Sequence, residues 1–363
     1  MEKPQTKSIP TPAMRVVLLG YMHGRGGIQT HTRFLAEGLR ERGHQVTVVS
    51  PAPMSTHGHE DKGEGVHVYS GLRELVRIIR GAQPDAAVVT GTGWASMLGV
   101  LAAGGSCKKV FFEVMSGARP AAFDPRVLSR FGFDAIVGQG SPVTRRFIRE
   151  FSWRGPNETI PALPEPLERQ FVIPARKLKS VKNGVRFAYF GRFGPAKNVR
   201  LLIERFEDYA CGKGTLDIWG GGSDADELAN MIEDRGLADR ITMKGRYPEG
   251  QAYIELLQNY DLMLLPTVAE EGAPLVLLEA MACGLPFVAN GMGGIPDYAN
   301  PDSIITANGD ITNFIPSVIT MVKRLENSDV DLARLQKHYI DHFSFVRLVD
   351  RWEAFLLTLV RPD

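Results

Sequence analysis

The chain has 363 residues, of which 44% are hydrophobic and 23% charged, and its formal net charge is +1 at pH 7. That length favours two domains, each large enough to bury most of its apolar surface. The near-neutral charge excludes a general attraction to nucleic acid or to an anionic membrane, so we expect no nucleic-acid partner and only local basic sites.

The three cysteines, Cys107, Cys211 and Cys283, stand apart, with no Cys-x-x-Cys pair. This pattern argues against a disulfide framework or a zinc knuckle and predicts a cytoplasmic protein. No apolar stretch reaches the ~20 residues that span a bilayer. Residues 1–13 are polar and proline-rich, which predicts a disordered tail rather than a signal peptide.

In the first half of the chain, short apolar runs alternate with amphipathic stretches. We expect buried parallel strands to begin at Arg15, Gln45, Ala86, Lys109 and Ala135. Between the first two runs, residues 32–43 place apolar side chains at helical spacing and end at a glycine. This predicts a βαβ unit.

A second series of the same kind predicts an α/β fold in the other half as well. Its strands are expected to begin at Arg186, Leu216, Ile241, Leu262, Pro286 and Ser303. The stretch 154–184 between the series is rich in proline, and we place the inter-domain linker at 169–183, between domains 14–168 and 184–344. The last residues, from Phe343, predict an amphipathic helix that must pack on another part of the chain.

The first candidate site is the segment 24–31 (GRGGIQTH), which follows the first strand and opens the first helix. Gly26 and Gly27 would let the backbone approach an anion, and the helix start supplies unpaired N–H groups. The dinucleotide fingerprint Gly-x-Gly-x-x-Gly is incomplete, because Gln29 stands where its third glycine belongs. The alternative is that the glycines only shape the loop.

The second candidate site is the segment 191–197 (GRFGPAK), at the end of the first strand of the second series. Open α/β sheets place their ligands at such strand ends. Arg192 and Lys197 would bring two positive charges to one point and hold a diphosphate. The alternative is a solvated basic loop.

The third candidate site is the segment 270–284 (EEGAPLVLLEAMACG). Pro274 suits the first position of a helix, so Glu271 lies just outside the helix and Glu279 inside it. Both acids can then face one cleft and bind hydroxyl groups along an elongated ligand. Glu279 has apolar neighbours in sequence and needs a partner. The alternative is a capping acid and a half-exposed helix acid.

The segment from Trp219 contains Asp224 and Asp226 at a spacing that resembles a metal-nucleotide site. We interpret Ser223 instead as a helix N-cap with acids in the first turn, and we expect no metal site. The neighbouring glycines, including Gly221 and Gly222, are expected to clear space for a ligand.

Together these segments resemble the retaining GT-B-fold glycosyltransferases, a family that includes phosphatidylinositol mannosyltransferases and sucrose synthases (glycosyltransferase family 4-like). Residues 26–50 look like the opening of that family, 191–197 like its phosphate-binding loop, and the spacing of Glu271 and Glu279 like its E-x7-E signature. The resemblance implies two Rossmann-like domains that face a central cleft. It also implies that the last helix, within 345–363, crosses back to the N-terminal, acceptor-binding domain.

The resemblance further implies a hexose-type transfer from a UDP- or GDP-sugar to a hydroxyl of a glycan, a lipid-linked acceptor or a small molecule, without a metal or another cofactor. Arg192, Lys197 and Glu271 would act in catalysis, Glu279 would bind the ribose, and the leaving diphosphate would help deprotonate the acceptor. The implied donor site consists of Gly26, Gly27, Arg192, Lys197, Gly221, Gly222, Glu271, Gly272, Ala273, Pro274, Leu275 and Glu279.

The chain departs from the family pattern in two places. A histidine that many members carry after the fourth strand is missing, and Glu113, Ser116 or Arg119 is expected to contact the sugar or the acceptor. The usual Gly-Phe-Gly is Gly272-Ala273-Pro274, and proline has no N–H to donate.

Several alternatives stay open at this stage. One is a catalytically inactive nucleotide-sugar-binding protein; others are a GT-B-like nucleotide-sugar epimerase and, with less support, a nicotinamide oxidoreductase. The segment 143–154 carries arginines among aromatic residues. It predicts either a peripheral membrane contact at the inner face or an ordinary half-buried helix.

Overall fold

The first strand lies in the middle of the sheet in both halves of the chain. The computed structural model describes residues 12–24, 26–53, 65–90, 93–105, 107–114, 124–269 and 271–361. The strand orders are β3-β2-β1-β4-β5-β6-β7 and β10-β9-β8-β11-β12-β13, and the paired strands run parallel. The order reverses at β1/β4 and at β8/β11, and open α/β sheets bind ligands beside such reversals.

The N-terminal domain surrounds the seven-stranded sheet. Its strands are β1 (Arg15–Leu19), β2 (Gln45–Pro51), β3 (Val66–Tyr69), β4 (Ala86–Thr90), β5 (Lys108–Glu113), β6 (Ala135–Gly138) and β7 (Asn157–Thr159). Its helices are α1 (Gly27–Glu41), α2 (Leu72–Ala82), α3 (Trp94–Ala103), η1 (Pro125–Phe131), α4 (Ser141–Glu150) and α5 (Leu167–Gln170).

Successive residues of the central strand β1 point to opposite faces of this sheet, as strand geometry requires. Val16 and Leu18 pack into one core cluster with α1, whereas Val17 and Leu19 pack into a second cluster with α2 and α3. Both faces are therefore covered, which is why the strands read as continuous apolar runs.

The C-terminal domain surrounds the six-stranded sheet. Its strands are β8 (Arg186–Phe193), β9 (Thr215–Gly222), β10 (Ile241–Gly245), β11 (Leu262–Leu265), β12 (Phe287–Ala289) and β13 (Ile304–Ile305). Its helices are η2 (Pro195–Lys197), α6 (Val199–Glu204), α7 (Phe206–Ala210), α8 (Ala225–Asp234), α9 (Gly250–Leu257), α10 (Leu275–Ala282), η3 (Ile295–Tyr298), η4 (Ala307–Gly309), η5 (Ile311–Asn313), α11 (Phe314–Glu326) and α12 (Leu332–His342).

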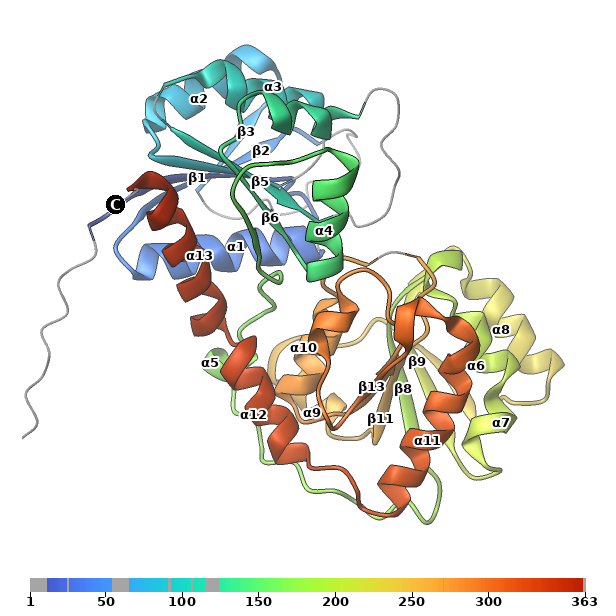
Figure 1. The fold of residues 1–363 in the computed structure, drawn as a ribbon. Coiled ribbons are helices and arrows are strands. Elements are labelled where there is room, and N and C mark those ends of the chain that lie inside the picture. Colours follow the sequence, from blue (N-terminus) through green and yellow to red (C-terminus); the bar gives the residue numbers. More distant parts are fainter. Residues whose placement is uncertain are drawn as a thin grey trace, which may run out of the picture.

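The last helix, α13 (Phe345–Val360), leaves the C-terminal domain and packs on the N-terminal one, where Figure 1 shows it beside α1. Its buried side chains, among them Leu348 and Trp352, belong to the same cluster as Val16 and Leu18. The Trp352 ring meets the Phe112 ring edge to face at 5.1 Å. The apolar stripe predicted at the end of the chain is therefore a part of the first domain's core.

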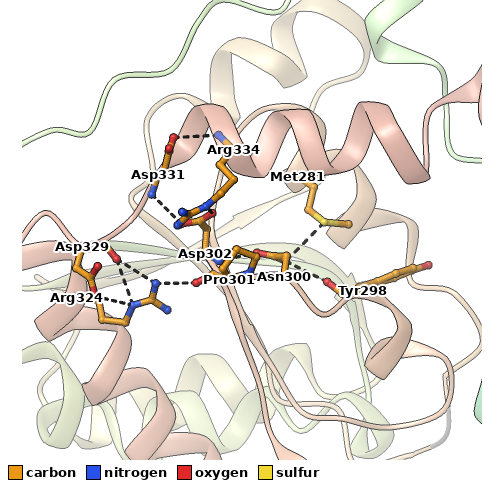
Figure 2. A network of polar contacts seen from close by, with 9 residues as sticks. All are labelled: Met281, Tyr298, Asn300, Pro301, Asp302, Arg324, Asp329, Asp331 and Arg334. Atoms are coloured by element: carbon orange, nitrogen blue, oxygen red, sulfur yellow. Dashed lines mark hydrogen bonds and ion pairs between the residues drawn. The ribbon is translucent and has the colours of Figure 1, made fainter.

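A polar network fastens α12 to the C-terminal domain before the chain crosses back (Figure 2). The fully buried Asp302 accepts hydrogen bonds from Arg334 at 2.7 and 2.8 Å and from the Asp331 N–H at 2.8 Å. Burial alone would raise the pKa of Asp302, but these bonds and the charge of Arg334 lower it below its ordinary value. Arg324 donates to the Pro301 carbonyl at 2.7 Å.

The structure corrects the sequence predictions at two edge strands, β3 and β7, which were missed. Both are short, and β7 is the polar tripeptide Asn157–Thr159 inside the proline-rich stretch. An edge strand has one neighbour, so its residues need not show a buried apolar run.

The structure favours a half-buried helix over a membrane-inserting one for the segment 143–154. The rings of Phe147 and Phe151 lie 4.6 Å apart, tilted against each other, within the core of the N-terminal domain, and Trp153 is also buried. The apolar side chains that a bilayer contact would require are thus already packed against protein. Among the described residues, no helix is both long and apolar enough to span a bilayer.

Candidate active site

The starts of helices α1 and α10 meet between the two domains. A Cβ added to Gly27 would lie 3.8 Å from Cδ1 of Leu275, so the two helix N-termini face each other at close range. Among the residues that the structure describes, neither helix receives a side-chain hydrogen bond at its N-cap, which is Gly26 for α1 and Pro274 for α10. Two such helix starts form a site that favours an anion.

Pro274 occupies a different helical position from the predicted one. It is the N-cap of α10, and the first helical residue is Leu275. The proline ring fixes φ near the helical value, here −66°, but ψ is 108°, which lies outside the helical range.

Lys197 and Glu271 form an ion pair at the carboxyl ends of β8 and β11. Glu271 also accepts a hydrogen bond from the buried Thr267 hydroxyl at 3.1 Å. The two loops are tied together by backbone, since the Val268 N–H donates to the Ala196 carbonyl at 2.9 Å. The second and third candidate sites contributed four side chains, and the structure pairs two of them, Lys197 and Glu271. It holds this pair at β8/β11, where the strand order of the C-terminal sheet reverses.

Arg192 lies at the end of β8 with its side chain exposed. Its carbonyl accepts a hydrogen bond from the Tyr189 hydroxyl at 2.8 Å, whereas its guanidinium has no hydrogen bond or ion pair within the described residues. Burial, followed by the charge of Glu271, raises the pKa of Tyr189, and the charge of Arg192 opposes that shift. Arg192 and Glu271 therefore both lie near enough to Tyr189 to act on its pKa, with opposite signs.

Glu279 points from α10 toward a tyrosine of α9. The Tyr253 hydroxyl donates a hydrogen bond to Oε2 of Glu279 at 3.1 Å. Burial raises the pKa of Glu279 to about 7, and the hydrogen bond from Tyr253 only partly offsets this effect. The acid predicted to need a partner has one in Tyr253, a residue that the sequence reasoning did not select.

Gly221 and Gly222 are strand residues of β9. They pair in register with Arg192 and Phe193 of β8 and so flank the strand that carries Arg192. Next to them, the predicted N-cap at Ser223 was wrong: α8 begins at Ala225 with Asp224 at its N-cap, and the Ser223 hydroxyl donates to Asp224 at 2.7 Å. Within the ranges that the structure describes, no cluster of three His, Cys, Asp or Glu side chains could hold a metal ion.

Glu113 is buried at the end of β5 and pairs with Arg126 at 3.3 Å. That ion pair belongs to the interior of the N-terminal domain, since both side chains are at most 7% exposed. Ser116 and Arg119, the other two residues predicted to face the sugar or the acceptor, lie outside the described residues.

Gln139 was not predicted as a site residue, although it touches the loop that carries Glu271. It is buried at the end of β6, and its Oε1 accepts the Ala273 N–H at 2.9 Å. Gly272 lies directly against it, because a Cβ at Gly272 would be 1.9 Å from that oxygen. The signal that could have identified Gln139 is its place, a polar residue directly after a buried strand at the ligand-binding edge.

The chain is similar in fold to solved structures and in sequence to two family models. It superposes on HepE from Anabaena, solved in complex with UDP, with a TM-score of 0.77 and 17% identity over 95% of this chain and 100% of that one. Residues 174–330 match the model of "Glycosyl transferases group 1", and residues 25–113 match that of "Glycosyltransferase Family 4". The chain belongs to the GT-B glycosyltransferases.

The chain is also similar in sequence to curated relatives. It is 26% identical to the N-acetyl-alpha-D-glucosaminyl L-malate synthase of Bacillus anthracis over 48% of this chain and 46% of the relative. It is 27% identical to the GDP-mannose-dependent alpha-(1-6)-phosphatidylinositol monomannoside mannosyltransferase of Mycolicibacterium smegmatis over 79% of this chain and 86% of the relative. The chain thus spans less than half the length of the first relative and most of the second.

Proposed function

We propose that the chain is a retaining glycosyltransferase that moves a hexose-type sugar from a nucleotide diphosphate sugar to an acceptor hydroxyl, without a metal ion. The observation that carries this proposal is the Lys197–Glu271 ion pair at the switch point of the C-terminal sheet. In the same domain, the start of α10 faces the start of α1. A diphosphate at this place would find two cations and two helix starts.

The donor diphosphate would compete with Glu271 for the Lys197 ammonium. A diphosphate carries more charge than one carboxylate, so Lys197 would turn to the phosphates together with Arg192. Glu271 would then keep its bond from Thr267 and accept a hydrogen bond from a hydroxyl of the transferred sugar. Glu279, which is held by Tyr253, would bind the ribose.

Protein groups would act mainly through charge in this reaction. As the bond from the anomeric carbon to the diphosphate breaks, negative charge grows on the leaving phosphate, where Lys197, Arg192 and the helix starts stabilise it. The departing phosphate would accept the proton of the attacking hydroxyl on the same face of the sugar. The configuration at the anomeric carbon would then be retained, and no metal would be required.

The similar proteins support a nucleotide-sugar donor but leave the base open, since one structure holds UDP and one relative is named for GDP-mannose. The acceptor in this proposal is a glycan, a lipid-linked sugar or a small molecule bound by the N-terminal domain. The free cysteines support a cytoplasmic location for the enzyme.

A thermal-shift panel of UDP- and GDP-sugars tests the donor. A ligand at 100 times its Kd adds roughly 2.7 kcal/mol of stability. Nucleotide release on adding an acceptor then separates a transferase from an inactive binding protein.

The variant Lys197→Ala tests the proposed role of Lys197. Its matched control is Lys213→Ala, which removes the same charge from an exposed turn before β9, at the opposite edge of the sheet. Equal turnover in both variants would contradict the proposed role of Lys197.

A further inference from the structure

The N- and C-terminal domains exchange hydrogen bonds beside the proposed donor loop, at a junction of Gln139, Ala273, Ser141 and Asp297 that we call the cleft floor. Gln139 of the N-terminal domain accepts the Ala273 N–H just ahead of α10. In the reverse direction, Asp297 of the C-terminal domain accepts the N–H of Ser141, the first residue of α4. Each domain thus supplies a side-chain acceptor to the start of a helix in the other.

The backbones approach so closely here that side chains would not fit. A Cβ on Gly140 would lie 2.5 Å from Cα of Gly294, and one on Gly272 would lie 2.7 Å from the Val114 carbonyl oxygen as well as against Gln139. The same loop is supported from behind, since the Gly294 N–H donates to the Glu271 and Gly272 carbonyls at 2.9 and 3.0 Å. The junction therefore includes the backbone of Glu271 itself.

The two covalent crossings between the domains are suited to act as a hinge. The chain passes between the domains through the linker and again between α12 and α13. There Glu168 accepts hydrogen bonds from the Tyr339 hydroxyl at 3.0 Å and from the Phe345 N–H at 2.9 Å. The Asp297–Ser141 bond lies near the second of these crossings, because both residues line one pocket with Phe343 and Arg347, and it joins the two domains there directly.

We propose that Gln139 and Asp297 form an interdomain latch that holds the cleft floor closed, and that Gln139 is a positioning residue for the loop carrying Glu271. The consequence for catalysis rests on the proposed function: with the latch open, the C-terminal domain still binds nucleotide through Lys197 and Arg192, but the acceptor domain no longer meets the sugar.

The latch can be opened from either side by substitution. Gln139→Leu keeps the side-chain volume and removes the acceptor, and Asp297→Ala removes the acceptor of the second bond by truncating the side chain. Asp297→Asn retains an oxygen that can accept the Ser141 N–H and is the conservative rescue. A net hydrogen bond is worth about a five-fold change in an equilibrium, so each removal is expected to shift the closed-to-open ratio about five-fold and the double variant further.

Gly140→Ala is the steric test, and the chain offers a matched control for it. Gly140 and Gly71 both precede helices at the same sheet edge with nearly equal backbone angles, φ −164° and ψ 156° against φ −161° and ψ 169°. A Cβ on Gly71 would have no neighbour within 4 Å, whereas one on Gly140 meets backbone. Gly140→Ala should therefore hold the cleft open, and Gly71→Ala should behave as the wild type.

Small-angle X-ray scattering of the ligand-free protein measures closure without any assay of activity. We expect a larger radius of gyration for Gly140→Ala and for the Gln139→Leu/Asp297→Ala pair, and wild-type values for Gly71→Ala and Asp297→Asn. Nucleotide affinity and turnover of the same variants are measured next, by calorimetric titration with UDP and GDP and by a nucleotide-release assay. In the open variants, nucleotide affinity should change less than two-fold, while kcat should fall about five-fold or more. A compact, fully active double variant would overturn the latch, even if Gly140→Ala failed to fold. If the variants open but the wild type shows no turnover, the result would support the latch and count against the transferase proposal.

Discussion

The ionisation of Glu279 offers a quantitative test of how this glycosyltransferase chain binds its donor. Burial raises the pKa of Glu279 to about 7, so in the free protein about one tenth of this carboxyl is ionised at pH 6 and about nine tenths at pH 8. In the proposed function, ribose hydroxyls would donate hydrogen bonds to the ionised form. We therefore expect donor affinity to rise close to ten-fold from pH 6 to pH 8.

Isothermal titration calorimetry with UDP-glucose and GDP-mannose measures this dependence. The sugar esters are preferable to free UDP or GDP because an esterified diphosphate has no group that titrates near neutral pH. Glu279→Gln is the control variant, since it keeps the shape of the side chain and cannot ionise. The donor affinity of Glu279→Gln should be lower than that of the wild type at pH 8. It should not change between pH 6 and pH 8. Binding should also release a proton in the wild type alone.

The same carboxyl lowers the stability of the protein without ligand. Native Glu279 keeps its proton up to about pH 7, whereas in the unfolded chain it loses the proton near its ordinary value of 4.5. The wild type should therefore lose stability relative to Glu279→Gln as the pH rises through this window, by on the order of 2 to 3 kcal/mol. Wild-type and variant profiles that coincide in both affinity and melting temperature would refute the reasoning.

Three further predictions concern charge, burial and metal dependence. Lys197→Ala should lower kcat by about 10² or more, because it removes a cation from the departing diphosphate, and Lys197→Arg should restore part of it in a nucleotide-release assay. Trp352→Ala should cost about 3 to 5 kcal/mol in urea unfolding, because Trp352 is fully buried, whereas Trp94→Ala, at a position that is 43% exposed, should cost less than about 0.5 kcal/mol. A chelator should leave turnover unchanged, and a strict requirement for a divalent ion would contradict the proposed mechanism.

Much of the fold could be predicted because buried parallel strands have a strong local signature. The strands that begin at Arg15, Ala86 and Leu262 are central, covered on both faces and uniformly apolar, so each is visible in four or five consecutive residues. The edge strands β3 and β7 have no such signature. The position of β7 depends on pairing with Ile136–Gly138, which lies about twenty residues away in the sequence.

The candidate site could be predicted only in part, for a related reason. Lys197 and Glu271 were identified because each follows a predicted strand, and parallel strands end at a common edge. Their direct pairing joins residues 74 apart in the sequence, and the hydrogen bond from Tyr253 to Glu279 joins two helices through residues 26 apart. The pKa of Glu279 could not be predicted either, because it depends on how completely neighbouring elements exclude water from α10.

Contacts between the domains were beyond the reach of local patterns, and they bear most directly on function. Ala273 and Gln139 are separated by 134 residues, and nothing in either segment identifies the other. Proline at 274 offers no N–H, so Ala273 and Leu275 are the nearest donors at the start of α10, and the acceptor domain already holds the first of them. A donor phosphate or sugar must therefore either displace the Gln139 oxygen or rely on Leu275 and the residues after it. The same side chain that closes the cleft thus limits which backbone groups remain free for the donor.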